Sequence, residues 1–255
     1  MFLAIDVGNT HVVVGIFEKD ELLVHWRFAS GVSRTEDEYW ALLTSLAEHR
    51  GVDLGRIGDA AISSVVPDLT PIIEKLVTDY LNTQPLIVTA DLNLGIRILY
   101  DDPRSVGADR LCNAVAGFQR YGGPLVVVDF GTATTFDVIT ENGDYLGGII
   151  ATGIETGAYL LHRHAAKLPK VRLAFPPGVV GRNTETAIQS GLMWGTVELV
   201  DGLLRRLIRQ FGEKLKTVAT GGLAKIVVPH LTEVEEIAPH LTLHGLRLIH
   251  ARTRG

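Results

Sequence analysis

The chain carries two copies of one strand-turn-strand pattern, and the second copy begins about halfway along its 255 residues. Residues 4–9 (Ala-Ile-Asp-Val-Gly-Asn) align with residues 127–132 (Val-Val-Asp-Phe-Gly-Thr), so that Asp6 falls on Asp129 and the two glycines coincide. Apolar and β-branched runs flank both turns, which predicts that each turn joins two strands. A duplicated domain is the simplest explanation, and chance similarity between two hairpins is the alternative.

The first of these turns, at residues 6–10, has the residue types of a phosphate site. Gly8 lets the backbone approach a ligand, and Asn9 and Thr10 offer side-chain donors beside the turn amides. Asp6, at the end of the strand, can hold a hydrated cation that bridges phosphate oxygens. The same residues also suit an ordinary chain reversal, so the second copy is what favours the phosphate site.

Composition narrows the class of protein. The net charge of -5 and the absence of a dense Lys/Arg run argue against nucleic acid as a partner. Cys112 is the single cysteine, which excludes an internal disulfide and suits a reducing cytoplasm. The first strand follows Met1 directly, so we expect no secretory segment, and the apolar runs are shorter than the ~20 residues of a membrane helix. We therefore expect a soluble, cytoplasmic protein without a membrane partner.

Local signals predict an α/β chain of two lobes, residues 1–122 and 123–255, divided at a Gly-Gly-Pro sequence. Residues 35–38 (Thr-Glu-Asp-Glu) have capping-box spacing and predict the start of a helix. Asn183 or Thr184 is expected to cap a long helix that runs to Phe211. Glycines near one face of that helix suggest that another backbone packs closely there, which would suit a subunit contact. These glycines are Gly191, Gly195 and Gly202.

The two commonest nucleotide loops, Gly-x-x-x-x-Gly-Lys-Ser/Thr and Gly-x-Gly-x-x-Gly, are absent from the sequence. Phosphates must then be held in another way. The two hairpins and a strand-Gly-Gly-helix turn at residues 220–222 would supply backbone amides from three directions. This arrangement favours ATP as the ligand.

Seven sequence blocks together resemble the type III pantothenate kinases, which belong to the superfamily of acetate and sugar kinases, Hsc70 and actin. The resemblance implies a duplicated actin-like (ribonuclease H-like) two-lobed kinase fold with mixed sheets flanked by helices. It also implies transfer of the γ-phosphoryl group of ATP to the primary hydroxyl of pantothenate, which gives 4'-phosphopantothenate in the first step of coenzyme A biosynthesis. The blocks are residues 6–10, 33–39, 62–67, 107–110 with Asn113, 128–135, 183–184 with 189–191, and 220–224.

The resemblance assigns ATP, with Mg²⁺ positioned by Asp6, to the two turns. The implied ATP-binding residues are Asp6, Val7, Gly8, Asn9, Thr10, His11, Val12, Val13 and Thr132.

On the same grounds Asp109 is the general base, because a carboxylate within hydrogen-bond reach can accept the hydroxyl proton of the substrate. A helix N-terminal cap is the alternative role for this residue. Arg110 would hold the substrate carboxylate, although an Arg in a first helical turn is more often solvated. The implied substrate-binding residues are Tyr100, Gly107, Ala108, Asp109, Arg110 and Thr184, for which loop, turn or cap roles are the alternatives.

The resemblance further implies a monovalent cation, K⁺ or NH₄⁺, bound by Asp129, and a homodimer. The alternative role for Asp129 is to orient its turn through hydrogen bonds, and whether Thr184 serves its own pocket or that of the partner subunit is open from the sequence. Two departures from the usual family pattern, residues 151–153 (Ala-Thr-Gly) and Arg182, put the local shape of the pocket in doubt.

Other activities remain open from the sequence. A kinase of the same superfamily that acts on a sugar or another small alcohol is one, and a non-catalytic nucleotide-binding regulator is another. The intact aspartates Asp6, Asp109 and Asp129 speak against the regulator. The histidine pairs 162/164 and 240/244 lack a third ligand at suitable spacing, so we do not expect a metal site there.

Overall fold

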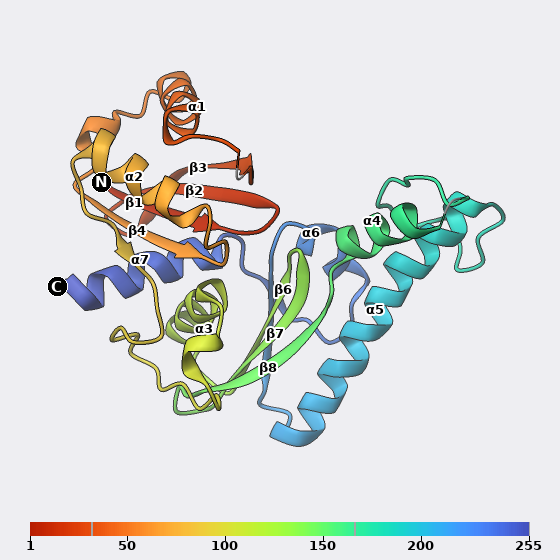
Figure 1. Cartoon of the computed structure of the whole chain (residues 1–255). Coiled ribbons are helices and arrows are strands. Elements are labelled where there is room, and N and C mark those ends of the chain that lie inside the picture. Colours follow the sequence, from red (N-terminus) through yellow and green to blue (C-terminus); the bar gives the residue numbers. More distant parts are fainter. Residues whose placement is uncertain (32, 166, 255) are drawn as a thin grey trace. The chain divides into compact units, whose positions relative to one another are not determined.

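The computed structural model describes residues 1–31, 33–165 and 167–254, which form two compact α/β units (Figure 1). The first unit comprises Met1–Ala116 together with Leu241–Gly255, and the second comprises Gly117–His240. The sequence prediction divides the chain after residue 122 and places its C-terminal end in the second lobe. In the structure, helix α7 (Leu241–Arg254) instead packs on strands of the first unit.

The first unit is built on a mixed sheet with the strand order β3-β2-β1-β4-β5. Strand β1 pairs antiparallel with β2 and parallel with β4, so it lies in the middle of the sheet. The elements are β1 (Phe2–Val7), β2 (His11–Glu18), β3 (Glu21–Ala29), α1 (Glu36–His49), β4 (Asp59–Ser64), α2 (Thr70–Leu81), β5 (Leu86–Ile87) and α3 (Ala108–Tyr121), whose last residues belong to the second unit.

The second unit repeats this topology. Its sheet has the order β10-β9-β6-β7-β8, which is the order of the first sheet when each strand is replaced by its counterpart in the second half. This repetition confirms the duplication inferred from the sequence. The elements are β6 (Leu125–Phe130), β7 (Ala133–Ile139), β8 (Tyr145–Thr152), α4 (Ile154–His164), α5 (Thr184–Phe211), β9 (Lys216–Thr220), α6 (Ala224–Val227) and β10 (Glu236–Ile237).

Helices cover both faces of the first sheet (Figure 1). The β1 residues Leu3, Ile5 and Val7 point to one face, where they share a core with residues of α1 and α2. The intervening residues of β1 point to the other face, where α7 packs: the rings of Phe2 and His250 lie 4.9 Å apart. Asp6 belongs to this second face, because side chains alternate along a strand.

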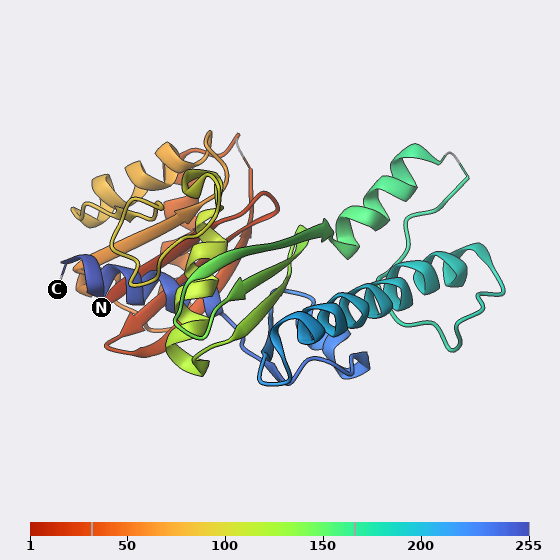
Figure 2. The same cartoon turned by 90° about the horizontal axis from the view of Figure 1, so that it is seen from below.

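Several local predictions are confirmed. Thr35 and Glu38 form both hydrogen bonds of the capping box at the start of α1. Asn183 caps α5, which runs without interruption to Phe211 (Figure 2). Around Gly191 and Gly195, however, an added Cβ would meet nothing within 4 Å in the described part of the chain. The close backbone neighbour expected at these glycines is therefore not supplied by the described residues of this chain.

Within the described ranges, we find no helix with the length and hydropathy needed to cross a membrane.

Candidate active site

The turn between β1 and β2 is held by backbone hydrogen bonds and by Ser30. The Gly8 N–H donates to the His11 carbonyl over 3.0 Å, and the Ser30 N–H donates to the Thr10 carbonyl over 2.9 Å. The Ser30 hydroxyl also donates to the Gly8 carbonyl, at 2.5 Å. Asn9 and Thr10 are exposed at the tip of this turn. The turn is thus fixed at its base and open at its tip, as a ligand-binding turn requires.

The other predicted ATP-binding residues divide into two groups. Val7 and Val12 are 0% and 1% exposed and belong to the hydrophobic core, so only their backbone groups are available to a ligand. His11 and Val13 are half-buried. Asp6 lies opposite Val13 on β2 and Ser63 on β4, at the end of β1 and next to the turn.

Asp109 lies in the first turn of α3. Its Oδ1 accepts the N–H of the next residue, Arg110, over 2.8 Å, a local contact within this first turn. A carboxylate has further acceptor sites, so this contact does not prevent it from accepting a proton. A Cβ on Gly107 would lie closer than 3.0 Å to the same Oδ1 and 3.3 Å from Val65, so only glycine leaves room for Asp109 in this position.

Burial raises the pKa of the Asp109 carboxyl, and the backbone N–H and the positive charge of Arg110 oppose this rise. Burial also raises the pKa of the Cys112 thiol, and the charges of Asp6 and Asp109 add to that effect. Both carboxylates are therefore close enough to Cys112 to act on it. The structure thus brings Asp6 and Asp109 to the same side of the first sheet, around Cys112.

The remaining substrate-binding candidates of the first unit surround Asp109 in sequence. Ala108 is buried, whereas Tyr100 and Gly107 are half-buried. Arg110 is only 7% exposed, so it is not the solvated side chain usual in a first helical turn. A buried guanidinium suits the binding of an anionic group.

In the second unit, Asp129 occupies the position that Asp6 has in the first. It lies opposite Thr135 on β7 and Thr220 on β9. Gly221 follows Thr220 with φ +95°, and a Cβ there would approach both the Asp129 Oδ1 and the Phe130 backbone closer than 3.0 Å. The Thr135 hydroxyl oxygen is buried, and no hydrogen-bond partner for it exists among the described residues. The Asp129 carboxylate and the Thr135 hydroxyl supply oxygens of the kind that bind a cation, and glycine at position 221 lets the backbone approach the carboxylate closely.

The second turn is anchored to α4. The Thr132 carbonyl accepts a hydrogen bond from the Thr156 hydroxyl over 2.6 Å. Gly153, which precedes α4, approaches the carbonyls of Gly131 and Thr132 so closely that an added Cβ would lie within 3.0 Å of both. Thr132 itself is exposed. The unusual 151–153 segment therefore keeps the glycine that this close approach requires.

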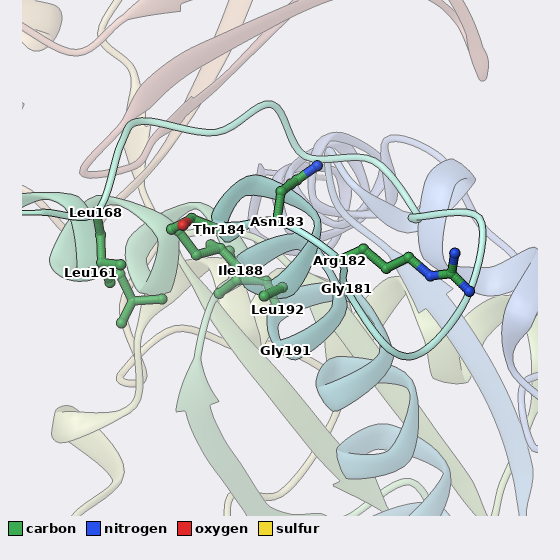
Figure 3. Close-up of a pocket in the computed structure, with 10 residues that line it drawn as sticks. Leu161, Leu168, Gly181, Arg182, Asn183, Thr184, Ile188, Gly191 and Leu192 are labelled. Carbon is green, nitrogen blue, oxygen red and sulfur yellow. The ribbon is translucent and has the colours of Figure 1, made fainter.

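Thr184 lies elsewhere, in a cavity of about 660 Å³ between α4 and the start of α5 (Figure 3). Leu161 of α4 and Leu168, which follows the end of that helix, line this cavity, and in Figure 3 the Arg182 side chain extends away from them. The Thr156 hydroxyl that binds the Thr132 carbonyl lies in the first turn of α4, whereas the cavity contacts Leu161 near the end of that helix. The cavity residues are Leu161, Leu168, Gly181, Arg182, Asn183, Thr184, Ala187, Ile188, Gly191 and Leu192.

Two further residues, Asn113 and Thr242, lie near Asp109, and neither received a role from the sequence. Asn113, one helical turn after Asp109, is 1% exposed and accepts a hydrogen bond from Thr242 of α7. Asn113 is part of a resemblance block, but Thr242 is not. Apolar residues at helical spacing, Leu243, Leu246 and Ile249, were the signal that could have revealed α7.

Across the described residues, no group of three or more His, Cys, Asp or Glu side chains has a metal-binding arrangement.

Comparison with known proteins identifies the family. The model of the type III pantothenate kinase family matches residues 2–206. The chain belongs to the type III pantothenate kinases. It is 47% identical over 252 residues to the type III pantothenate kinase of Moorella thermoacetica, covering 99% of each chain. It is 48% identical over 254 residues to that of Anaeromyxobacter sp. (strain Fw109-5), covering 100% of each.

Solved structures support the fold of this type III pantothenate kinase. The ethanolamine utilization protein EutJ from Carboxydothermus hydrogenoformans aligns over 97% of this chain and 89% of its own, with a TM-score of 0.56 and 14% identity. The (R)-2-hydroxyglutaryl-CoA dehydratase component A from Acidaminococcus fermentans aligns over 97% and 96%, with a TM-score of 0.52 and 18% identity. The duplicated, actin-like α/β fold expected from the sequence is confirmed.

Proposed function

We propose that Asp109 is the general base of this kinase, which transfers the γ-phosphoryl group of ATP to the primary hydroxyl of pantothenate. The product, 4'-phosphopantothenate, starts coenzyme A biosynthesis. The observation that carries the proposal is the position of the half-buried Asp109 carboxylate on the same side of the first sheet as Asp6. Burial also raises the pKa of this carboxyl. A base with a raised pKa accepts a proton more readily than an ordinary aspartate.

In the proposed reaction, the Asp109 carboxylate accepts the proton of the substrate hydroxyl. The hydroxyl oxygen forms a bond to the γ-phosphorus while the bond from that phosphorus to the bridging oxygen of ADP breaks. In phosphoryl transfer the protein takes little part in covalent bonding. It contributes by positioning the hydroxyl and the γ-phosphoryl group and by stabilising charge. The Arg110 guanidinium would pair with the substrate carboxylate and so orient the hydroxyl toward Asp109.

The turn from Asp6 to Val13 would bind the ATP phosphates. Its exposed tip presents Asn9 and Thr10, while Val7 and Val12 contribute only backbone groups. Asp6 is a suitable carboxylate for holding Mg²⁺, which when bound neutralises phosphate charge. Thr132, exposed in the second turn and tied to α4, would bind ATP as well.

We assign the monovalent cation, K⁺ or NH₄⁺, to Asp129. Support comes from the buried Thr135 hydroxyl opposite it and from the close approach of the Gly221 backbone to the carboxylate. A cation bound there supplies positive charge next to the phosphate-binding turn. The alternative, that Asp129 only orients its turn, would leave the reaction rate independent of the cation.

A homodimer is the proposed assembly. Several apolar side chains are exposed on and near α4, including Tyr159 at 62% and Ile150 at 63%. Gly191 and Gly195 of α5 have open space beside them in the described chain. Large exposed apolar areas of this kind are typical of subunit contacts. Thr184, which lines the cavity next to α4, would then lie near the partner subunit and act on the substrate bound there.

A kinase for sugars or other small alcohols is the enzymatic alternative. The test is an assay of phosphoryl transfer from ATP to pantothenate and to a panel of sugars under the same conditions. We expect 4'-phosphopantothenate to form and the sugars to remain unmodified. Activity on a sugar alone would overturn the substrate assignment, and no transfer to any acceptor would favour a non-catalytic regulator.

A further inference from the structure

We propose that helix α7 positions the general base, and that Thr242 and Gly245 are the residues through which it acts. The inference rests on the proposed role of Asp109. Neither residue touches the reacting atoms in this account. Both contact α3 about one helical turn beyond Asp109, and they fix where the start of α3 lies on the sheet that carries Asp6.

The first contact is a hydrogen bond between side chains. The Thr242 hydroxyl donates to the Asn113 Oδ1 over 2.9 Å. Asn113 is 1% exposed and follows Asp109 by four residues, so the two side chains lie on the same face of α3. This partly buried hydrogen bond helps to specify one arrangement of the two helices, because losing it leaves the buried Asn113 side chain with one contact fewer.

The second contact is made by backbone. A Cβ on Gly245 would approach the Cα, carbonyl carbon and carbonyl oxygen of Cys112 closer than 3.0 Å. Backbone atoms in the middle of a helix cannot yield as a flexible side chain can, so α7 and α3 touch here without room for a methyl group. Cys112 is the residue on which both Asp6 and Asp109 act electrostatically. The contact therefore lies beside the two proposed active-site carboxylates.

Helix α7 is itself tied to the sheet at several points. The His244 ring packs edge-on against Phe17 at 5.2 Å, and Arg247 forms an ion pair with Asp20 at 2.5 Å. Leu243 packs where Gly15 lacks a side chain. One face of α7 thus holds the sheet while Thr242 and Gly245 hold α3. The distance from the phosphate turn to Asp109 is set in part by this helix.

The test uses the full-length enzyme and single variants of Thr242, Thr253, Gly245 and Asp109. Thr242→Val removes the hydroxyl at nearly constant volume, and Thr242→Ser keeps it. Thr253→Val is the matched control, because among the described residues the Thr253 hydroxyl bonds only to the Ile249 carbonyl of its own helix, at 2.8 Å. For each variant we would measure kcat, the KM values for ATP and pantothenate, and the melting temperature.

We expect kcat of T242V to fall about tenfold, since small displacements of a catalytic group have large effects on rate. The KM for ATP should stay close to that of the wild type, because the Thr242 hydroxyl bonds to Asn113 of α3 and not to a residue of the turn from Asp6 to Val13. T242S should restore kcat, and T253V should match the wild type. G245A should lower kcat in the same way, and T242V decides the question if G245A does not fold.

The inference is overturned if T242V has a lower melting temperature but the kcat of the wild type, because α7 would then only stabilise the fold. It is also overturned if T242S fails to restore the rate that T242V loses. Measuring Asp109→Asn alongside separates the two proposals. A normal rate in D109N refutes the base assignment itself, whereas an inactive D109N beside a fully active T242V refutes only the positioning role.

Discussion

Asp6 and Asp129 occupy the same position in two sheets of the same strand order. Asp6 lies opposite Val13 on one neighbouring strand and Ser63 on the other, and Asp129 lies opposite Thr135 and Thr220. Each aspartate is the next-to-last residue of a central strand, and a glycine-containing turn follows that strand. The side chains opposite them differ, however. Two hydroxyl side chains flank Asp129, whereas Asp6 has one hydroxyl and one apolar neighbour, which suits different cation roles for the two sites.

Asp129→Asn is expected to remove the dependence of the rate on K⁺, because the amide lacks the charge that holds a cation beside Thr135 and Gly221. The measurement is kcat as a function of K⁺ concentration, with Na⁺ keeping the ionic strength constant. Asp79→Asn, an exposed change on α2, is the control and should retain the K⁺ response. A wild-type enzyme that runs equally fast in Na⁺ and K⁺ would refute the cation site.

Subunit mixing tests whether Thr184 serves the substrate of the partner subunit. We expect Thr184→Val and Asp109→Asn each to be nearly inactive as homodimers. If each pocket combines Asp109 of one subunit with Thr184 of the other, a mixed dimer of the two variants contains one intact pocket. Activity should therefore reappear when the variants are unfolded and refolded together. No recovery in mixed dimers of verified composition would place Thr184 and Asp109 of the same chain in one pocket.

The raised pKa of Asp109 has two consequences for pH. The base must be ionised to act, so kcat/KM should fall, as the pH decreases, at a higher pH than an ordinary aspartate would give. Ionising a carboxyl whose pKa is raised on folding also costs stability once the pH exceeds its ordinary range. D109N should therefore melt at a higher temperature than the wild type at neutral pH.

That gain should narrow toward about pH 4, where the carboxyl in both folded and unfolded chains becomes protonated. Differential scanning calorimetry across this range is the measurement, with the exposed change Asp91→Asn as control. A D109N variant less stable than the wild type at neutral pH would show that the hydrogen bond from Arg110 to the carboxylate outweighs the cost of burying its charge.

Local chemistry made much of the fold predictable. Thr35 and Glu38 predict the start of α1, because the two residues of a capping box form hydrogen bonds with backbone amides at the start of the helix and lie close together in sequence. The aligned aspartates Asp6 and Asp129 indicate the duplication, because each strand and the turn after it are contiguous in sequence and can be compared directly. The two-residue strand β10 was missed, because a strand of that length has no readable periodicity.

The packing of α7 could not be predicted in the same way. Thr242 and Asn113 are joined by one hydrogen bond but are separated by 129 residues, and no local pattern indicates which distant surface a helix will cover. The burial of Arg110 could not be predicted either, since side chains in a first helical turn are usually exposed. Sequence motifs were enough to predict the candidate site residues. The residues that surround and position them could be identified only from the structure.

The most direct test of the central claim is the rate of 4'-phosphopantothenate formation by Asp109→Asn, measured together with ATP binding by calorimetry on the same preparation. Loss of the base should lower kcat by about 10²- to 10⁴-fold, while the dissociation constant for ATP stays near that of the wild type. A D109N enzyme that binds ATP and forms product at the wild-type rate would contradict the claim.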